Sequence, residues 1–238
     1  MTPPIVCLPG LGADHRLFAP QLEAFPSAIV PDWPPDPGAA DLEALAAAIR
    51  RDLIDRGAWT PQTLLVGFSF GAQVALTMTL AAIDGAEPPP RAVALVSGLW
   101  TAGQLTPAFR RQAAAARFVP DALMRWSARS LVAPRFARAC ALDASQTRRL
   151  IQMARDLNAA RLKRHARLAA RWSVSANDLA SLRDAGVRLL GVHAGRDPVI
   201  PPPKGPPAGC EIIDARAHLL TWSHADRVND LIRRGIDP

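Results

Sequence analysis

A serine lies at the centre of a glycine-flanked turn, in the segment Gly67-Phe68-Ser69-Phe70-Gly71. The apolar run Thr63–Val66 precedes this segment and the helical pattern Gln73–Ile83 follows it, so the turn joins a strand to a helix. A strand-to-helix turn this tight needs glycine at its flanks and projects the serine hydroxyl above the sheet. This context predicts that Ser69 is a nucleophile.

A serine hydroxyl is a weak nucleophile, so it needs a base that a third group orients. His218 follows the late apolar run Cys210–Ile213, and Asp197 follows the run Val187–Val192 in a turn that Pro198 stiffens. The order of serine, acid and histidine along the chain is one that α/β enzymes use. We therefore predict His218 as the base and Asp197 as the acid that orients it.

Other acids and histidines compete for these two roles. Asp184 and Asp214 are the rival acids, but Asp184 precedes a strand and therefore falls at the opposite edge of the sheet. His224 is the rival base, six residues beyond His218, at a predicted helix start that favours a capping or surface role. His193 ends a strand four residues before the predicted acid, where a core or surface position is expected, with a supporting hydrogen bond as the alternative.

A second glycine turn supplies candidate donors for an oxyanion. The segment Pro9-Gly10-Leu11-Gly12 follows the apolar run Ile5–Leu8, and its glycines let the chain turn back over Ser69. The backbone N–H groups of Leu11 and Phe70 would then converge on one space. Such donors are each worth about 3–4 kcal/mol in the transition state. We predict an oxyanion hole here.

The elements that must position these residues alternate along the chain. Strand-type runs are apolar on both faces and alternate with helical patterns, which indicates a parallel sheet covered by helices on both sides. The six predicted strands are Ile5–Leu8, Ala28–Val30, Thr63–Val66, Ala92–Val96, Val187–Val192 and Cys210–Ile213. The predicted helices of this layered part are Asp41–Arg56, Gln73–Ile83 and about His224 to Arg234.

The segment 105–180 differs from the rest of the chain. It has no strand pattern, only Ala/Arg/Leu-rich helical stretches broken at Pro107, Pro120 and Pro134. It carries 14 Arg and one Lys against four Asp, a net charge of +11, whereas the whole chain has +7. A helical insertion between parallel strands predicts a lid over their carboxyl ends, where such sheets place their sites. Its charge suits acidic partners or anionic substrates, or else a solvated helix face.

Composition limits the domain number, the cellular location and the kinds of ligand that we expect. A chain of 238 residues that is 49% apolar can form one domain spanning residues 1–238. Three cysteines (Cys7, Cys140, Cys210) without metal-ligand or disulfide spacing indicate a cytoplasmic protein. The composition of residues 1–10 predicts neither a signal peptide nor a membrane anchor, and we expect no membrane-spanning run elsewhere. The positive charge lacks a nucleic-acid motif, so no nucleic-acid partner is expected. No residue cluster predicts a metal site, and the chemistry needs no cofactor.

Together these motifs resemble the α/β-hydrolase superfamily over essentially the whole chain. The segments Leu8–Asp14 and Val66–Gly71 are similar to a compact bacterial group of serine esterases that includes pimeloyl-acyl-carrier-protein methyl ester esterases. The resemblance implies an α/β-hydrolase fold with about six strands and a helical lid. It also implies a triad and an oxyanion hole at the residues named above. Pro9, Ala72 and Ala217 depart from the family pattern, which usually has His, Gly and Gly there.

The expected activity is carboxylesterase-type cleavage of an ester through an acyl-enzyme. Aromatic residues beside the motifs, Phe68, Phe70, Trp100 and Trp222, are predicted to line an apolar substrate pocket, with a core role as the alternative. Thioester cleavage, acyl transfer, perhydrolysis and C–C bond hydrolysis use the same groups and stay open. So do a methyl ester esterase acting on an acidic acyl carrier protein and a ligand-binding protein that does not hydrolyse. Oligomeric state is not predicted.

Overall fold

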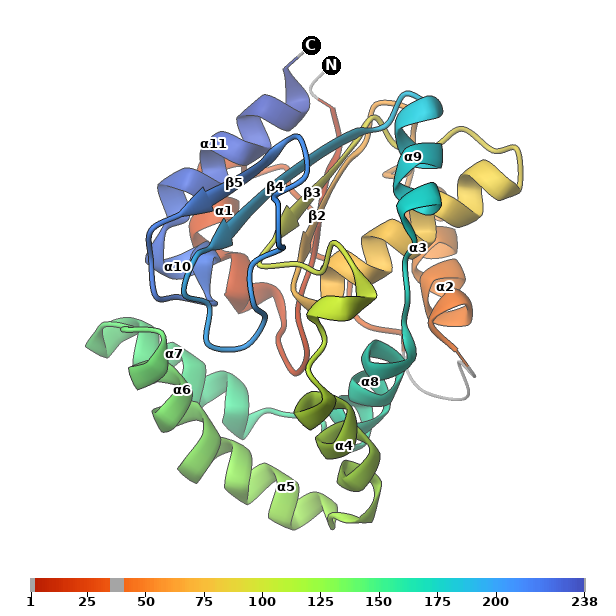
Figure 1. The fold of residues 1–238 in the computed structure, drawn as a ribbon. Helices are drawn as coiled ribbons and strands as arrows, with labels where there is room; N and C mark the ends of the chain where they lie inside the picture. The colour runs from red at the N-terminus through yellow and green to blue at the C-terminus, as the bar shows by residue number, and fades with distance from the viewer. Residues whose placement is uncertain (1–2, 35–40, 238) are drawn as a thin grey trace.

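Five parallel strands form the centre of the molecule (Figure 1). The computed structural model describes residues 3–34 and 41–237. The sheet order follows the chain, and every neighbouring pair is parallel. The strands are β1 (Ile5–Leu8), β2 (Leu64–Phe68), β3 (Ala92–Val96), β4 (Arg188–Ala194) and β5 (Cys210–Ile213). The predicted α/β fold with a parallel sheet is therefore confirmed.

The predicted strand Ala28–Val30 contributes a single bridge to the sheet instead of a full strand. Ile29 pairs with Val6, and its carbonyl and N–H each form a 2.8 Å hydrogen bond with β1. Pro26 and Pro31 bracket this run. Because proline has no backbone N–H, the ladder cannot extend far in either direction. The described residues thus hold five strands and one bridge where six strands were predicted.

Helices cover both faces of the sheet, and each face has its own apolar cluster. One cluster contains residues of α2 (Leu42–Asp55), α3 (Phe70–Asp84) and α9 (Ala176–Asp184). The other lies under α10 (Leu220–Ser223) and α11 (Ala225–Ile236), with α1 (Ala19–Ala24) and the short 3-10 helix η1 (His15–Phe18) beside them. Alternate residues of β1, β2 and β3 enter opposite clusters, which explains why these three strands are apolar throughout.

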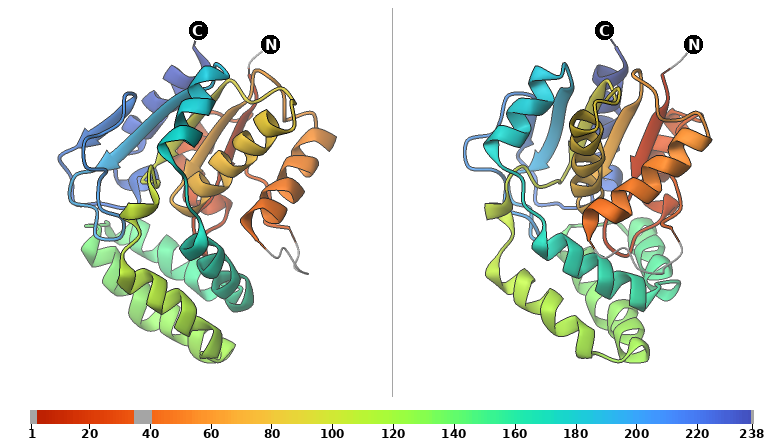
Figure 2. Two further views of the ribbon diagram at one scale, coloured as in Figure 1. Left: turned by 45° about the vertical axis from the view of Figure 1, so that its right-hand side comes forward. Right: turned by 90° about the vertical axis from the view of Figure 1, so that its right-hand side faces the viewer.

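The chain between β3 and β4 is helical. After η2 (Ala102–Gln104), it forms α4 (Pro107–Ala115), η3 (Ala116–Phe118), α5 (Asp121–Ser127), η4 (Ala128–Val132), α6 (Ala133–Ala139), α7 (Ala144–Arg155) and α8 (Ala159–Arg171). We call residues 107–171 the helical insertion. It lies beyond the carboxyl ends of the strands as a separate layer, as Figures 1 and 2 show.

Pro134 does not break the helical insertion, contrary to the sequence-based expectation. Helical structure continues from Asp121 to Ala139, with the π-helical stretch η4 immediately before α6. The wider turn carries the N–H of Ala133 back to the carbonyl of Ala128. A π-turn of this kind absorbs the hydrogen bond that proline cannot donate. Pro107 and Pro120, by contrast, lie at the starts of α4 and α5 as predicted.

No helix in the described part of the chain is long and apolar enough to cross a bilayer.

Candidate active site

Ser69 lies at a strained turn between β2 and α3. Its φ of +52° is unusual for a residue other than glycine. The flanking positions admit only glycine: a Cβ on Gly67 would lie 2.4 Å from the Cα of Ala72, and one on Gly71 would lie 2.0 Å from the carbonyl oxygen of Leu8. The glycines thus let the turn pack against the end of β1, and this packing holds Ser69 in its conformation.

The structure brings the three predicted triad residues together. Nε2 of His218 lies 3.2 Å from Oγ of Ser69, and Nδ1 lies 2.7 Å from Oδ2 of Asp197. A carboxylate can only accept hydrogen bonds, so Nδ1 carries the hydrogen and Nε2 is free to take one. The Asp197 side chain is fully buried, and the His218 side chain is 5% exposed. The residues come from the ends of β2 and β4 and from the loop after β5.

The loop that carries Asp197 is fixed by its own backbone. Oδ1 of Asp197 accepts the N–H of Val199 at 2.7 Å and that of Ile200 at 3.0 Å, so both carboxylate oxygens are engaged. The buried ring of His193 adds a third hydrogen bond to this loop, because its Nε2 donates to the carbonyl of Ile200 at 2.9 Å. That nitrogen is 3.6 Å from Asp197 Oδ2, too far for the direct hydrogen bond that was the alternative to a core position.

Burial lowers the pKa of His193 from its usual 6.5, although the hydrogen bond to Ile200 and the charge of Asp197 act in the opposite sense. The ring is therefore kept neutral beneath the site. Since Nε2 donates its hydrogen, Nδ1 is an acceptor, and it has no partner among the described residues. His193 supports the loop of Asp197 through the carbonyl of Ile200 and not through direct contact with the carboxylate.

The turn after β1 packs directly on the serine. A Cβ on Gly10 would lie 3.4 Å from the Cβ of Ser69 and 2.8 Å from the ring of Phe68. The backbone N–H groups of Leu11 and Phe70 form no hydrogen bond within the described residues. Both residues line a cavity together with Ser69. This arrangement fits two free donors on one space, and their role as an oxyanion hole stays a prediction.

Two cavities meet at Ser69. The larger, of about 370 Å³, lies between the sheet and the helical insertion and has an almost entirely apolar lining. The insertion contributes residues such as Phe136, Leu150 and Met153 to it. The smaller, of about 50 Å³, lies against Phe70, Leu105, Phe109 and Ile200. Leu11, Ser69 and Val199 line both.

Of the predicted pocket aromatics, Phe68 lines the larger cavity and Phe70 the smaller. Trp100 and Trp222 line neither, so their assignment to the pocket is wrong. Trp100 is 1% exposed. Its ring packs so closely on Gly191 that a Cβ added there would lie 2.3 Å from Cζ2 of the indole. Trp222 is buried in α10 and donates its indole N–H to the carbonyl of Arg16. Both are core residues.

The rival residues lie elsewhere. Asp184 ends α9 before β4 begins, and Asp214 is exposed and paired with Arg196 at 2.8 Å. His224 occupies the N-cap position of α11 but makes no capping hydrogen bond; its Nδ1 is 2.9 Å from the hydroxyl of Ser223.

The described residues contain no group of three or more His, Cys, Asp or Glu placed to hold a metal.

The order of strands, the turn at Ser69 and the helical insertion point to one family. The sequence model of the alpha/beta hydrolase family matches residues 5–231. The chain belongs to this family. No curated protein matches the chain. The finer likeness to pimeloyl-acyl-carrier-protein methyl ester esterases therefore stays a prediction.

Several solved structures share this fold at low sequence identity. A thermophilic esterase from Thermogutta terrifontis is 19% identical, with a TM-score of 0.75. The match covers 98% of this chain and 88% of the esterase chain. A hydrolase from Pseudomonas aeruginosa is 15% identical, with a TM-score of 0.72 and coverage of 99% and 91%. MenH from S. aureus is 15% identical, with a TM-score of 0.71 and coverage of 99% and 94%. At this identity the likeness concerns the fold alone.

Proposed function

We propose that this α/β hydrolase is a serine esterase that cleaves carboxylic esters through an acyl-enzyme. The observation that carries the proposal is the continuous chain of contacts from Ser69 Oγ to His218 Nε2 and from His218 Nδ1 to Asp197. That chain ends on a buried carboxylate and begins at a half-buried hydroxyl that faces two cavities. Structural neighbours described as esterases support the same reaction class.

In the first half-reaction, Ser69 Oγ attacks the ester carbon while its proton passes to His218 Nε2. The negative oxygen of the tetrahedral intermediate accepts the N–H groups of Leu11 and Phe70. The intermediate collapses, and the departing alkoxide takes the proton from His218, which leaves an acyl-Ser69. Asp197 stays ionised and stabilises the imidazolium.

In the second half-reaction, water attacks the acyl carbon and gives a proton to His218. The C–Oγ bond then breaks, the carboxylic acid leaves, and Ser69 regains its hydrogen from His218. Thioester cleavage and acyl transfer share the first half-reaction and differ in the leaving group or the acceptor. A substrate panel therefore separates them.

The two cavities support a substrate with unequal ends. We propose that the apolar cavity of about 370 Å³ receives a long apolar substituent and that the cavity of about 50 Å³ receives a short one. Burial of each methylene in the apolar cavity adds about 0.8 kcal/mol of binding free energy. The helical insertion supplies one wall of the larger cavity, which supports its proposed role as a lid.

The test is hydrolysis of p-nitrophenyl butyrate by the wild type and by Ser69→Ala and His218→Ala variants. Each variant should lose activity by about 10⁴–10⁶-fold. Ser145→Ala, which removes an exposed hydroxyl from α7, is the matched control and should keep wild-type activity. Wild-type rates in Ser69→Ala would overturn the proposal, as would a wild type inert toward esters and thioesters of every acyl length.

A further inference from the structure

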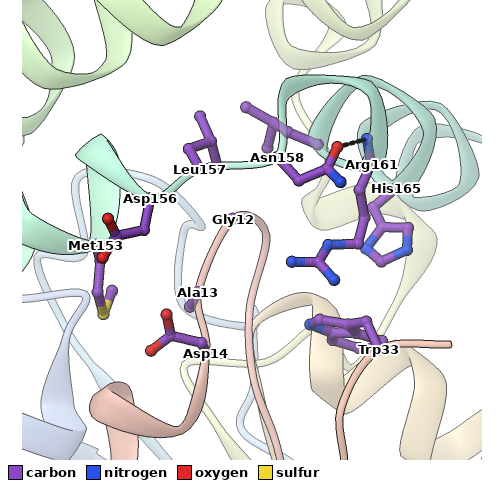
Figure 3. A pocket seen from close by; sticks show the side chains of 11 residues that line it. Gly12, Ala13, Asp14, Trp33, Met153, Asp156, Leu157, Asn158, Arg161 and His165 are labelled. Carbon is purple, nitrogen blue, oxygen red and sulfur yellow. Dashed lines mark hydrogen bonds between the residues drawn. The ribbon is translucent and has the colours of Figure 1, made fainter. Parts of the chain in front are cut away.

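A small polar pocket adjoins the larger cavity, with which it shares lining residues (Figure 3). It lies between the turn Gly12–Asp14, the ring of Trp33 and the chain from Met153 to His165. Its free volume is about 20 Å³. A single water needs about 10–15 Å³ by this measure, so the pocket has room for one small polar group.

The guanidinium of Arg161 points into this pocket and has no hydrogen-bond or ion-pair partner among the described residues. The side chain leaves α8 and runs across the pocket above Trp33 (Figure 3). Arg161 is half-buried, and its one hydrogen bond to a described side chain, Asn158, comes from its backbone N–H. By contrast, the Nζ of Lys163 on the same helix pairs with Asp121 at 2.5 Å. A partly dehydrated cation with no protein partner favours an anionic ligand.

The two carboxylates at the pocket do not satisfy Arg161, because Arg16 holds both. The Arg16 guanidinium binds Asp14 at 2.6 Å and Asp156 at 2.7 Å. Although burial raises the pKa of Asp14, the hydrogen bonds from the side chain and backbone of Arg16 lower it overall, so this pair stays ionised. The charge of Arg161 is therefore left for a ligand.

The polar pocket and the larger cavity are separated by one layer of side chains. Five residues line both: Gly12, Ala13, Met153, Leu157 and Leu162. A Cβ on Gly12 would lie 2.9 Å from Cδ1 of Leu157 and 3.5 Å from Cδ1 of Leu162, so these two leucines form the partition. A flexible chain attached at Ser69 and lying in the larger cavity can reach this partition, because Ser69, Leu157 and Leu162 line the same cavity.

We propose that Arg161 binds a carboxylate at the far end of the substrate, so that the preferred ester is a half-ester of a dicarboxylic acid. The apolar middle of the acyl chain occupies the larger cavity, and the free carboxylate passes the leucine partition to meet the guanidinium. The planar guanidinium can hold a carboxylate through two parallel hydrogen bonds. The inference rests on the proposed esterase activity and adds a substrate class to it.

The test compares p-nitrophenyl monoesters of succinic, adipic and suberic acid with the uncharged butyrate, hexanoate and octanoate. Arg161→Ala should raise KM for the favoured anionic ester by about 10- to 100-fold. It should change kcat/KM for the uncharged esters by less than about twofold, because they make no bond to the guanidinium. Arg161→Lys should restore part of the loss. Arg167→Ala, which removes an exposed charge from the same helix, should change neither class.

An effect of Arg161→Ala that is equal for charged and uncharged esters would overturn the subsite while leaving the esterase proposal intact. So would a wild type that disfavours every monoester relative to its uncharged partner. A wild type that hydrolyses no ester at all overturns the esterase proposal itself. Calorimetry with monomethyl adipate in the Ser69→Ala background gives a readout that does not need turnover. Binding there should be lost on adding Arg161→Ala, and equal binding in both proteins would contradict the subsite.

Discussion

The hydroxyl of Ser97 donates a 2.7 Å hydrogen bond to the carbonyl oxygen of His218, 121 positions further along the chain. Ser97 directly follows β3, is fully buried, and has a φ of +47°. Its N–H bonds to the carbonyl of Val192 on β4 at 3.0 Å. The central strands thus hold the backbone of the proposed base from below. Ser97 is a positioning residue, since it contacts the backbone of His218 and not the reacting atoms.

Ser97→Ala should lower kcat for p-nitrophenyl butyrate by roughly tenfold and change KM less, because a small displacement of the imidazole weakens catalysis more than binding. It should also lower the free energy of unfolding by about 0.5–1.5 kcal/mol, since the His218 carbonyl loses one of its two donors and keeps the N–H of Leu220. Ser181→Ala, which removes an exposed hydroxyl-to-carbonyl bond from α9, is the control. Equal kinetics in the two variants would contradict the positioning role.

Asp197→Asn should reduce kcat by about 10³–10⁴-fold, because an amide nitrogen facing Nδ1 of His218 stabilises the wrong tautomer. The fold should persist, since the amide oxygen can still accept the N–H groups of Val199 and Ile200. Steady-state kinetics and circular dichroism measure the two effects. Asp214→Asn changes the exposed rival acid and should keep full activity. The assignment fails if Asp214→Asn is the more damaging change.

His193→Gln should make stability less sensitive to acid. The native pKa of His193 lies below its usual 6.5, mainly because of burial, so the unfolded chain binds this proton more readily. The contribution of the neutral His193 ring to the free energy of unfolding is fully present above about pH 6.5. This contribution is lost as the pH falls from there through the pKa that His193 has in the folded protein. Glutamine keeps a donor toward Ile200 but does not titrate.

Urea unfolding of both proteins at pH 8 and at pH 5.5 measures this contribution. The wild type should lose more stability than His193→Gln between the two values, while the other titrating groups cancel in the comparison. Parallel pH dependences would show that His193 titrates alike in the folded and unfolded chain, against the expectation from its burial.

Leu150→Trp should fill part of the larger cavity, which Leu150 lines from α7. We expect kcat/KM for p-nitrophenyl octanoate to fall by about tenfold or more relative to the acetate, because several methylenes lose their apolar surroundings. The melting temperature reports any overpacking, which costs about 1–3 kcal/mol. Leu105→Trp narrows the smaller cavity instead and should leave the octanoate-to-acetate ratio near the wild-type value. An unchanged ratio in Leu150→Trp would place the acyl chain elsewhere.

The sequence sufficed to predict which residues meet at the site, because their chemistry is tied to strand ends. Ser69, Asp197 and His218 each follow a strand, and the carboxyl ends of parallel strands fall at one edge of a sheet. Glycines at a tight turn are a local signal, and the contacts of Gly67 and Gly71 account for it. Local rules of this kind need no knowledge of tertiary packing.

Features that depend on distant packing could not be predicted. Trp100 and Trp222 lie close to the motifs in sequence and are buried in the core. An aromatic residue beside a motif looks the same in the sequence whether its side chain lines a cavity or packs in the core. Ser97 and Arg161 gave no signal either. The importance of Ser97 comes from a partner 121 positions away, and that of Arg161 from the partners it lacks among the described residues. The single bridge at Ile29 likewise depends on where two prolines stop a ladder.

The most direct test of the central claim is labelling with a fluorophosphonate, followed by peptide mass spectrometry and a parallel assay with p-nitrophenyl butyrate. Competing reaction at the deeply buried Cys7 is not expected, because burial raises the pKa of its thiol to about 12. The account predicts one equivalent of label on Ser69, activity lost in step with labelling, and much slower labelling in His218→Ala. Full ester hydrolysis by protein whose Ser69 is stoichiometrically labelled, or hydrolysis with the label on another residue, would contradict it.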